Sequence, residues 1–102
     1  MQHDLFVHPN GRLRSIYPLI VQLQSDVSEG RERIVAPLTP FSLMPAPESR
    51  VRPTIRHDGT DYAVVMRLMG AIPATHLRRP VGSIAAWRDD ISRALDWLFF
   101  GI

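Results

Sequence analysis

The chain ends with SIAAWRDDISRALDWLFFGI, residues 83–102, which has the clearest helical period in the sequence. Apolar residues recur there at three- and four-residue steps, which places them on one side of an α-helix. These residues are Ile84, Trp87, Ile91, Ala94, Leu95 and Leu98. Ser83 follows Gly82 and stands where an N-cap is expected. The sequence therefore predicts a C-terminal helix over residues 83–100 that docks on the rest of the chain through this apolar stripe.

The last turn of this helix carries two aromatic residues outside the stripe. At about 100° per residue, Trp97 and Phe100 fall on the far side of the helix. They are three residues apart, so their rings are neighbours. Aromatic side chains bury large areas when they are covered, so this pair predicts an interaction surface for a second copy of the chain or for a target protein. The alternative is that the tail tucks into its own core.

Upstream of the helix, short segments of alternating polarity predict strands over about residues 2–69. Residues 17–24 have the best pattern and predict a half-buried antiparallel strand. Residues 31–38 should pair back with it, and Pro37 implies an edge position or a strand end. Residues 70–82 read as a connector to the helix. Together these segments predict a mostly β fold, in which an antiparallel sheet curls into a small barrel followed by one helix.

Two turn signals divide the predicted strands. Asn10-Gly11 should turn a first hairpin, with Arg12 and Arg14 on the returning arm. Asp58-Gly59 should turn a second hairpin in the same way.

Composition limits the class of protein. The 102 residues allow one domain, and 45% of them are apolar, which is enough for a core. There is no cysteine, which excludes disulfides and thiolate chemistry and suits the cytoplasm. Asp4 stands near the start and no long apolar run follows, so we expect neither a signal peptide nor a membrane span. The net charge of +2 gives weak support for direct nucleic-acid binding.

The residues that could carry chemistry form few patterns. The histidines, His3, His8, His57 and His76, lack metal-ligand spacing, so no metal site is expected. An RNA-cleaving site would need an arginine beside an acid and a base. Arg31, Glu32, Arg33 and His57 are the candidates for such a site. On a strand, however, Glu32 opposes the two arginines, so an exposed charged strand is the simpler interpretation.

The helix end, Leu98-Phe99-Phe100-Gly101-Ile102, closely resembles the C-terminal signature Met-Phe-Trp-Gly-Ile of CcdB-type toxins, the DNA gyrase poisons of toxin–antitoxin modules. Four further segments match the family in its order and at nearly its spacing: Met1-Gln2, Val21–Asp26, Arg31–Leu38 and Leu68–Pro73. Because these matches cover most of the chain, it is identified as a member of the CcdB family. The resemblance implies one CcdB-like domain over residues 1–102, an SH3-like antiparallel barrel with a C-terminal α-helix.

CcdB-type toxins resemble wedges rather than enzymes. The resemblance implies a homodimer that inserts between the two A subunits of gyrase and traps the cleaved gyrase–DNA complex. No catalytic residue, cofactor or metal is needed, and DNA is met only through gyrase or the antitoxin complex. The resemblance also implies neutralisation by a CcdA-type antitoxin and a role in plasmid maintenance. An mRNA-cleaving toxin on a related barrel stays open as the alternative.

The resemblance also assigns residues to these contacts. The gyrase contacts would lie on the helix end and in the loop after the second strand, at Asp96, Phe99, Phe100, Gly101, Ile102, Val27 and Ser28. Trp97 has no counterpart in the family pattern and could take over part of this contact. Leu98 and Ile102 would meet their copies at the dimer axis. A disordered, acidic-hydrophobic antitoxin segment would bind at Asn10, Gly11, Arg12, Leu13 and Arg14.

Three positions depart from the family pattern. Phe100 stands for tryptophan, Asp96 for asparagine and Ser28 for a loop isoleucine. Phenylalanine keeps the stacking area but lacks the indole N–H, and an aspartate carboxylate is costly to bury without a partner. These departures leave open a CcdB relative that has lost or changed its gyrase target.

Overall fold

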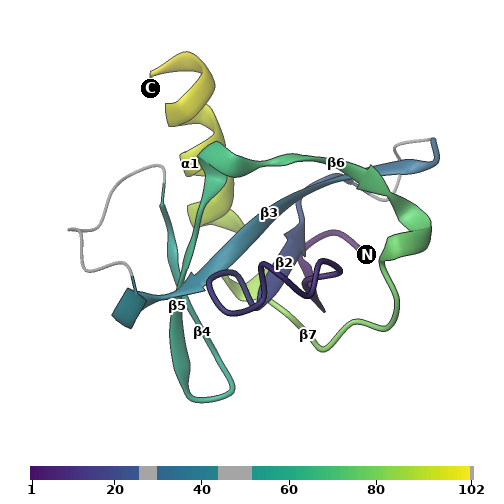
Figure 1. Ribbon diagram of the computed structural model, residues 1–102. Coiled ribbons are helices and arrows are strands. Elements are labelled where there is room, and N and C mark those ends of the chain that lie inside the picture. Colours follow the sequence, from purple (N-terminus) through teal and green to yellow (C-terminus); the bar gives the residue numbers. More distant parts are fainter. Residues whose placement is uncertain (26–29, 44–51, 102) are drawn as a thin grey trace.

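Seven β-strands and one α-helix form the regular structure of the described residues, which are 1–25, 30–43 and 52–101 of this computed structural model. The strands are β1 (Asp4–Val7), β2 (Leu19–Gln22), β3 (Glu32–Pro40), β4 (Thr54–His57), β5 (Thr60–Val64), β6 (Gly70–Pro73) and β7 (Gly82–Ser83). The helix, α1 (Arg88–Phe100), closes the chain (Figure 1). Short 3₁₀ turns are η1 (Phe41–Leu43), η2 (Met66–Leu68), η3 (Ala74–His76) and η4 (Ala85–Trp87).

The central strand of the curved antiparallel sheet is β3. One side of β3 pairs with β2, and the other side pairs first with β6 and then with β5. The strand order is β4-β5-β3-β2-β1-β7, with β6 beside the first half of β3. This sheet nearly closes into a barrel, and α1 packs against it (Figure 1). The predicted fold class, a mostly β, SH3-like antiparallel barrel with a C-terminal helix, is therefore confirmed.

The two ends of this strand order meet at a glycine. A Cβ atom added to Gly82 of β7 would lie 2.5 Å from Cε1 of His57, the last residue of β4. A Cβ atom does not approach a ring atom so closely, so any other residue at position 82 would require the His57 ring to shift. The imidazole ring of His57 thus packs on the bare backbone of Gly82 where the barrel closes.

The interior of the barrel is filled from both the strands and the helix. One cluster of buried residues joins Leu5, Leu19, Val21, Leu23, Ala36, Leu38, Ile55, Val64, Met66, Ile84, Ile91 and Ala94. The partly buried Trp87, Leu95 and Leu98 pack against this cluster. All six members of the predicted apolar stripe therefore face the core.

The β2 strand is buried on both faces, so the prediction of a half-buried strand is wrong. Ile20 belongs to a second cluster with Phe6 and Val35, on the face opposite the main core. Ile72 and Leu77, from β6 and the segment after η3, cover this cluster. The expectation that residues 70–82 form only a connector is also wrong, because β6 pairs with β3 and β7 pairs with β1.

Pro37 lies in the central strand, so the predicted edge position is also wrong. It faces Ile20 of β2, and its carbonyl accepts a hydrogen bond from the Val65 amide at 2.9 Å. It stands where the far-side partner of β3 changes from β6 to β5. A residue without an N–H is tolerated here because the ladder is interrupted at this point.

The two predicted hairpin turns have different outcomes. Asp58 and Gly59 both have positive φ, 50° and 81°, as a two-residue hairpin turn requires, so the β4–β5 prediction is confirmed. Asn10-Gly11 instead begins a longer loop between β1 and β2. The Asn10 side-chain oxygen accepts the Arg12 amide at 3.0 Å, and the Leu13 amide donates to the Asn10 carbonyl at 3.0 Å. Arg12 and Arg14 therefore lie in this loop and not on a returning strand.

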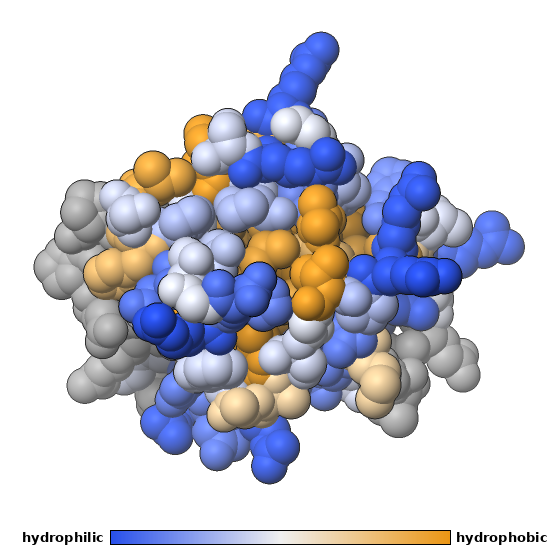
Figure 2. Space-filling view, turned by 90° about the horizontal axis from the view of Figure 1, so that it is seen from below, coloured by the Kyte–Doolittle hydropathy of each residue, from blue (hydrophilic) through white to orange (hydrophobic). Residues whose placement is uncertain are grey.

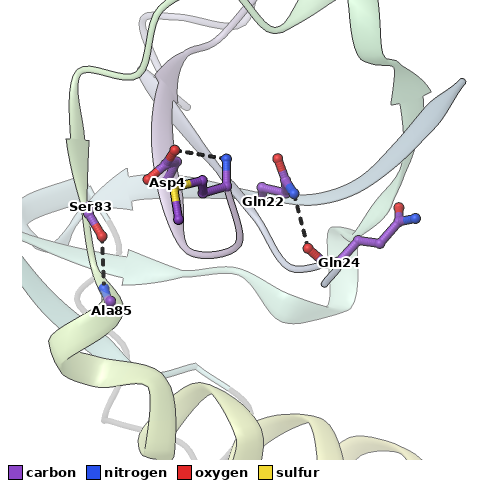
Figure 3. Close-up of polar contacts among 6 residues, drawn as sticks. Asp4, Gln22, Gln24, Ser83 and Ala85 are labelled. Carbon is purple, nitrogen blue, oxygen red and sulfur yellow. Dashed lines mark hydrogen bonds and ion pairs between the residues drawn. The ribbon is translucent and has the colours of Figure 1, made fainter. Parts of the chain in front are cut away.

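The α-helix starts five residues later than predicted. Ser83 is not its N-cap: the hydroxyl oxygen of Ser83 accepts the Ala85 amide at 3.2 Å (Figure 3), but the N-cap of η4 is Ile84 and the N-cap of α1 is Trp87. The chain then makes the 3₁₀ turn η4 before α1 begins at Arg88. Asp89 and Asp90 in the first turn of α1 favour the positive end of the helix dipole.

Buried polar groups in the first strands are also satisfied. Gln22 is buried, and its side-chain amide donates to the Gln24 carbonyl at 3.0 Å (Figure 3). The amino terminus pairs with the Asp4 carboxylate at 2.9 Å (Figure 3).

Within the described ranges, no helix has the length and apolar content needed to cross a membrane.

Candidate functional site

The C-terminal end of α1 presents aromatic side chains to solvent. Phe100 is 74% exposed, Phe99 is 62% exposed and Trp97 is 37% exposed, whereas Ile91 on the core face is 1% exposed. This end of the helix projects away from the sheet at the top of Figure 1. The predicted separation of a docking stripe from exposed aromatic residues at the helix end is therefore confirmed. We call Trp97, Phe99 and Phe100 the aromatic tip.

The aromatic tip ends in a left-handed glycine. Gly101 has a φ of 70° and donates its amide to the Trp97 carbonyl at 3.1 Å, which terminates the helix. A side chain at this position would be strained, so glycine fixes the direction in which the last residue leaves the helix. Ile102, predicted to contact both gyrase and the second copy, lies outside the described residues.

The other residues predicted to meet gyrase or the second copy fall in different surroundings. Asp96 is exposed on α1, one turn before Phe100. Leu98 packs partly buried against its own core, so a second copy could reach only part of its surface. Val27 and Ser28 lie outside the described residues. The structure thus brings the helix residues together, while the loop half of the predicted site is not described.

One exposed apolar residue near the helix was missed. Leu68 lies in η2, which packs against α1, and its side chain is mostly exposed although Met66 in the same turn is fully buried. The sequence predicts strands as far as about residue 69, which gives no reason to separate Leu68 from its buried neighbours. The turn in η2 rotates it outward.

The loop predicted to bind an antitoxin is ordered by its own polar groups. The Asn10 amide donates to Nδ1 of His8 at 3.1 Å, and Nε of Arg14 donates to the His8 carbonyl at 2.6 Å. Burial lowers the pKa of His8, and the positive charge of Arg14 lowers it further. Asn10, Gly11, Arg12, Leu13 and Arg14 are all exposed. The loop therefore presents its predicted contact residues from a defined backbone.

The candidates for an RNA-cleaving site do not converge. Glu32 and Arg33 lie at the start of β3, where Nη1 of Arg33 donates to the Gly30 and Glu32 carbonyls at 2.7 and 2.9 Å. His57 lies at the β4–β5 turn and packs on Gly82. The start of β3 and this turn lie at different ends of the molecule (Figure 1). Among the described residues, no group of three or more His, Asp or Glu side chains is placed to hold a metal ion.

The chain was compared with known proteins and families. It matches the model of the family described as CcdB protein over residues 2–101. The match includes the loop at residues 10–14 and the helix end as far as Gly101. A search of curated proteins gave no match.

Proposed function

Because the chain belongs to the CcdB family of toxins from toxin–antitoxin modules, we propose that it binds the A subunit of DNA gyrase and traps the cleaved gyrase–DNA complex. The observation that carries the proposal is the aromatic tip, since three large rings stand exposed on a helix whose opposite face is already buried. Exposed aromatic clusters of this kind are typical of binding hot spots. The family acts by binding rather than by catalysis.

The proposed mechanism is that of a wedge. The cleaved state of gyrase opens a gap between its two A subunits, and a ligand that binds only this state raises its population. A two-fold symmetric target calls for a two-fold symmetric ligand, so we propose that the toxin acts as a homodimer with Leu98 and Ile102 at the axis. DNA would then be contacted only through gyrase or the antitoxin complex.

We assign the contact with gyrase to the helix end and one loop. Phe100, Phe99 and Trp97 would fill apolar pockets, while Asp96 would need a hydrogen-bond donor on gyrase. Gly101 and Ile102 would complete the tip, and Val27 and Ser28 would contact the same subunit. A CcdA-type antitoxin would bind Asn10, Gly11, Arg12, Leu13 and Arg14, and the module would act in the cytoplasm to maintain a plasmid.

A second candidate function is a CcdB relative that binds a target other than gyrase. It is favoured by Phe100 and Asp96, which change the chemistry of the tip without removing its apolar area. The RNA-cleaving alternative gains no support, because Arg33 and His57 lie in different parts of the barrel.

The deciding experiment incubates the purified protein with gyrase, ATP and supercoiled plasmid. A gyrase poison raises the amount of linear DNA that is covalently bound to protein, and heat-denatured toxin serves as the control. A parallel incubation with RNA and no gyrase tests the enzymatic alternative. If linear DNA does not rise while the folded protein still binds its antitoxin, the target is not gyrase and the second candidate function stands.

A further inference from the structure

The loop between β1 and β2 is anchored on His8, the residue that follows β1. The His8 amide donates to the Pro18 carbonyl at 3.0 Å, which joins this residue to the chain entering β2. The His8 carbonyl accepts Nε of Arg14 at 2.6 Å, and Nδ1 of the ring accepts the Asn10 amide at 3.1 Å. The backbone and the ring of His8 therefore both hold the loop, and of these only the ring can change its charge near neutral pH.

The bond to the His8 ring supports further hydrogen bonds in the loop. The Asn10 side-chain oxygen accepts the Arg12 amide at 3.0 Å, and the Asn10 carbonyl accepts the Leu13 amide at 3.0 Å. The Leu13 carbonyl in turn accepts the Tyr17 amide at 2.7 Å. Because Asn10, Arg12 and Leu13 are exposed, packing adds little to these bonds, and the conformation of the loop depends on them.

An amide N–H can donate only to a ring nitrogen that carries no proton. The Asn10 amide therefore requires a neutral His8 with its proton on Nε2 and a free lone pair on Nδ1. Protonation of the ring puts a hydrogen on Nδ1 as well, so that two donors face each other at this position. The hydrogen bond is then lost, and the ring has to turn away from the Asn10 amide.

The charged groups around His8 oppose protonation of its ring. The titratable or charged residues of the elements next to it are Asp4 on β1, Arg12 and Arg14 in the loop, Tyr17 before β2, and His76, Arg78 and Arg79 before β7. The one acid among them, Asp4, lies at the other end of β1 and pairs with the amino terminus at 2.9 Å. Burial lowers the pKa of His8, and the positive charge of Arg14 lowers it further. The neutral ring is therefore the form present at neutral pH.

A surface hollow of about 910 Å³ collects positive charge beside this loop. Its lining includes Val7 and Pro9, on either side of His8, and Arg14, Arg78 and Arg79. Among the described residues, no acidic side chain lines it. Figure 2 shows the molecule from below, the side along which the segment entering β7 runs, with hydrophilic side chains projecting into solvent. A charged His8 ring would thus be repelled by Arg14 as well as by the Asn10 amide.

From these contacts, we propose that His8 is a proton-sensitive switch in the β1–β2 loop, closed while Nδ1 accepts the Asn10 amide and open when Nδ1 is protonated. Opening releases residues 10–13, and it requires a pH below 6.5. The bond from Arg14 to the His8 carbonyl does not involve the ring, so the opening is local and leaves the barrel folded. Only the consequence for a partner rests on the proposed function, because the released residues are among those assigned to the antitoxin.

The test is a titration of the free protein by ¹⁵N NMR between about pH 7.5 and pH 4.5. The two ring nitrogens of His8 report which of them carries the proton. Hydrogen exchange of the Asn10 amide, corrected for the intrinsic effect of pH on exchange, reports the hydrogen bond. At pH 7.5 we expect the proton on Nε2 and a protected Asn10 amide. Protection should fall by about two- to tenfold as His8 titrates, which is the loss expected for one hydrogen bond.

Two substitutions separate the hydrogen-bond acceptor from the charge. His8→Asn places an oxygen that does not titrate where Nδ1 stands, so the Asn10 amide should stay protected at every pH. His8→Phe keeps a ring but has no acceptor, so protection should be low at every pH. His3→Asn is the matched control, because it removes a histidine at the other end of β1, where asparagine tolerates the positive φ of 68°. It should leave the pH dependence at Asn10 unchanged.

Three results would each overturn the proposal. They are a neutral His8 with its proton on Nδ1, an Asn10 amide that is equally protected at both ends of the titration, and a His8→Asn protein with the pH dependence of the wild type. Thermal unfolding at both pH values shows that each variant is folded.

The gyrase assay keeps the switch distinct from the proposed function, since every readout of the switch is made on the free protein. A loop that opens with pH in a protein that does not poison gyrase would remove the proposed target alone. A loop that does not respond to pH in a protein that poisons gyrase would remove the switch alone.

Discussion

The substitution Phe100→Ala should separate binding from stability. Phe100 is the most exposed ring of the aromatic tip, at 74%, so its own fold covers only about a quarter of its surface. The buried Ile91, on the opposite face of the same helix, gives a matched control inside the core. If the tip is an interaction surface, the two truncations should have opposite effects on stability and on gyrase poisoning.

The expected magnitudes follow from burial. A phenylalanine offers roughly 200 Å², so covering a quarter of it contributes at most about 1 kcal/mol at roughly 25 cal/mol per Å². Truncating a fully buried isoleucine to alanine costs about 2–5 kcal/mol. In a complex, a hot-spot ring that becomes covered contributes about 2 kcal/mol or more, which corresponds to a loss of affinity of about 30-fold.

The assay pairs urea unfolding with titration of gyrase cleavage. Phe100→Ala should unfold close to the wild type and should need about 30 times more protein to produce the same linear DNA. Ile91→Ala should unfold far earlier, and whatever fraction stays folded should still poison gyrase. Ile16→Ala removes an exposed apolar residue of the β1–β2 loop and should change neither readout. A Phe100→Ala protein that poisons gyrase within threefold of the wild type, or that loses as much stability as Ile91→Ala, would refute the reasoning.

Three further predictions concern the barrel itself. Gly82→Ala should lower the free energy of unfolding, because its Cβ would lie 2.5 Å from the His57 ring, and His57→Ala in the same protein should recover part of that loss. Gly59→Ala has open space but a φ of 81°, so it should cost only the backbone strain of about 1–2 kcal/mol, and no second substitution should rescue it. Burial lowers the folded-state pKa of His3 and of His8 below 6.5, so the unfolded chain binds protons more readily. The free energy of unfolding should therefore have its highest value above pH 6.5 and should fall as the pH drops below 6.5. Replacing both histidines with glutamine should make the free energy of unfolding depend less on pH, as measured by urea titrations at pH 7.5 and pH 5.5.

The helix could be predicted well because its information is local. A repeat of three and four residues fixes which side chains share a face, and one buried face is enough to leave Trp97 and Phe100 outside. The start of the helix was predicted less well, since Ser83 accepts a hydrogen bond from the Ala85 amide but the chain makes the 3₁₀ turn η4, with Ile84 as its N-cap, before α1 begins. A sequence motif for capping specifies the bond but not the kind of turn that follows it.

The strands were harder to predict because their partners are distant in sequence. The alternation in β2 predicts one buried face, but Ile20 is covered by Ile72 and Leu77, more than fifty positions away.

Turn signals in the sequence have the same limit. Asp58-Gly59 makes a tight hairpin, while Asn10-Gly11 uses its side chain to hold a loop. Both sequences permit positive φ, and the strand register on either side decides whether it is used.

The same reasoning explains which functional features the sequence could indicate. The aromatic tip is a local pattern, whereas the surface hollow that brings Arg14 beside Arg78 and Arg79 joins distant parts of the chain and has no linear signature. The C-terminal end of α1 and the segment entering β7 lie on different sides of the molecule (Figure 1). Neutralisation by a partner bound at residues 10–14 would require a chain long enough to continue around the barrel and cover Phe100, so we expect the length of that partner to decide whether it silences the aromatic tip.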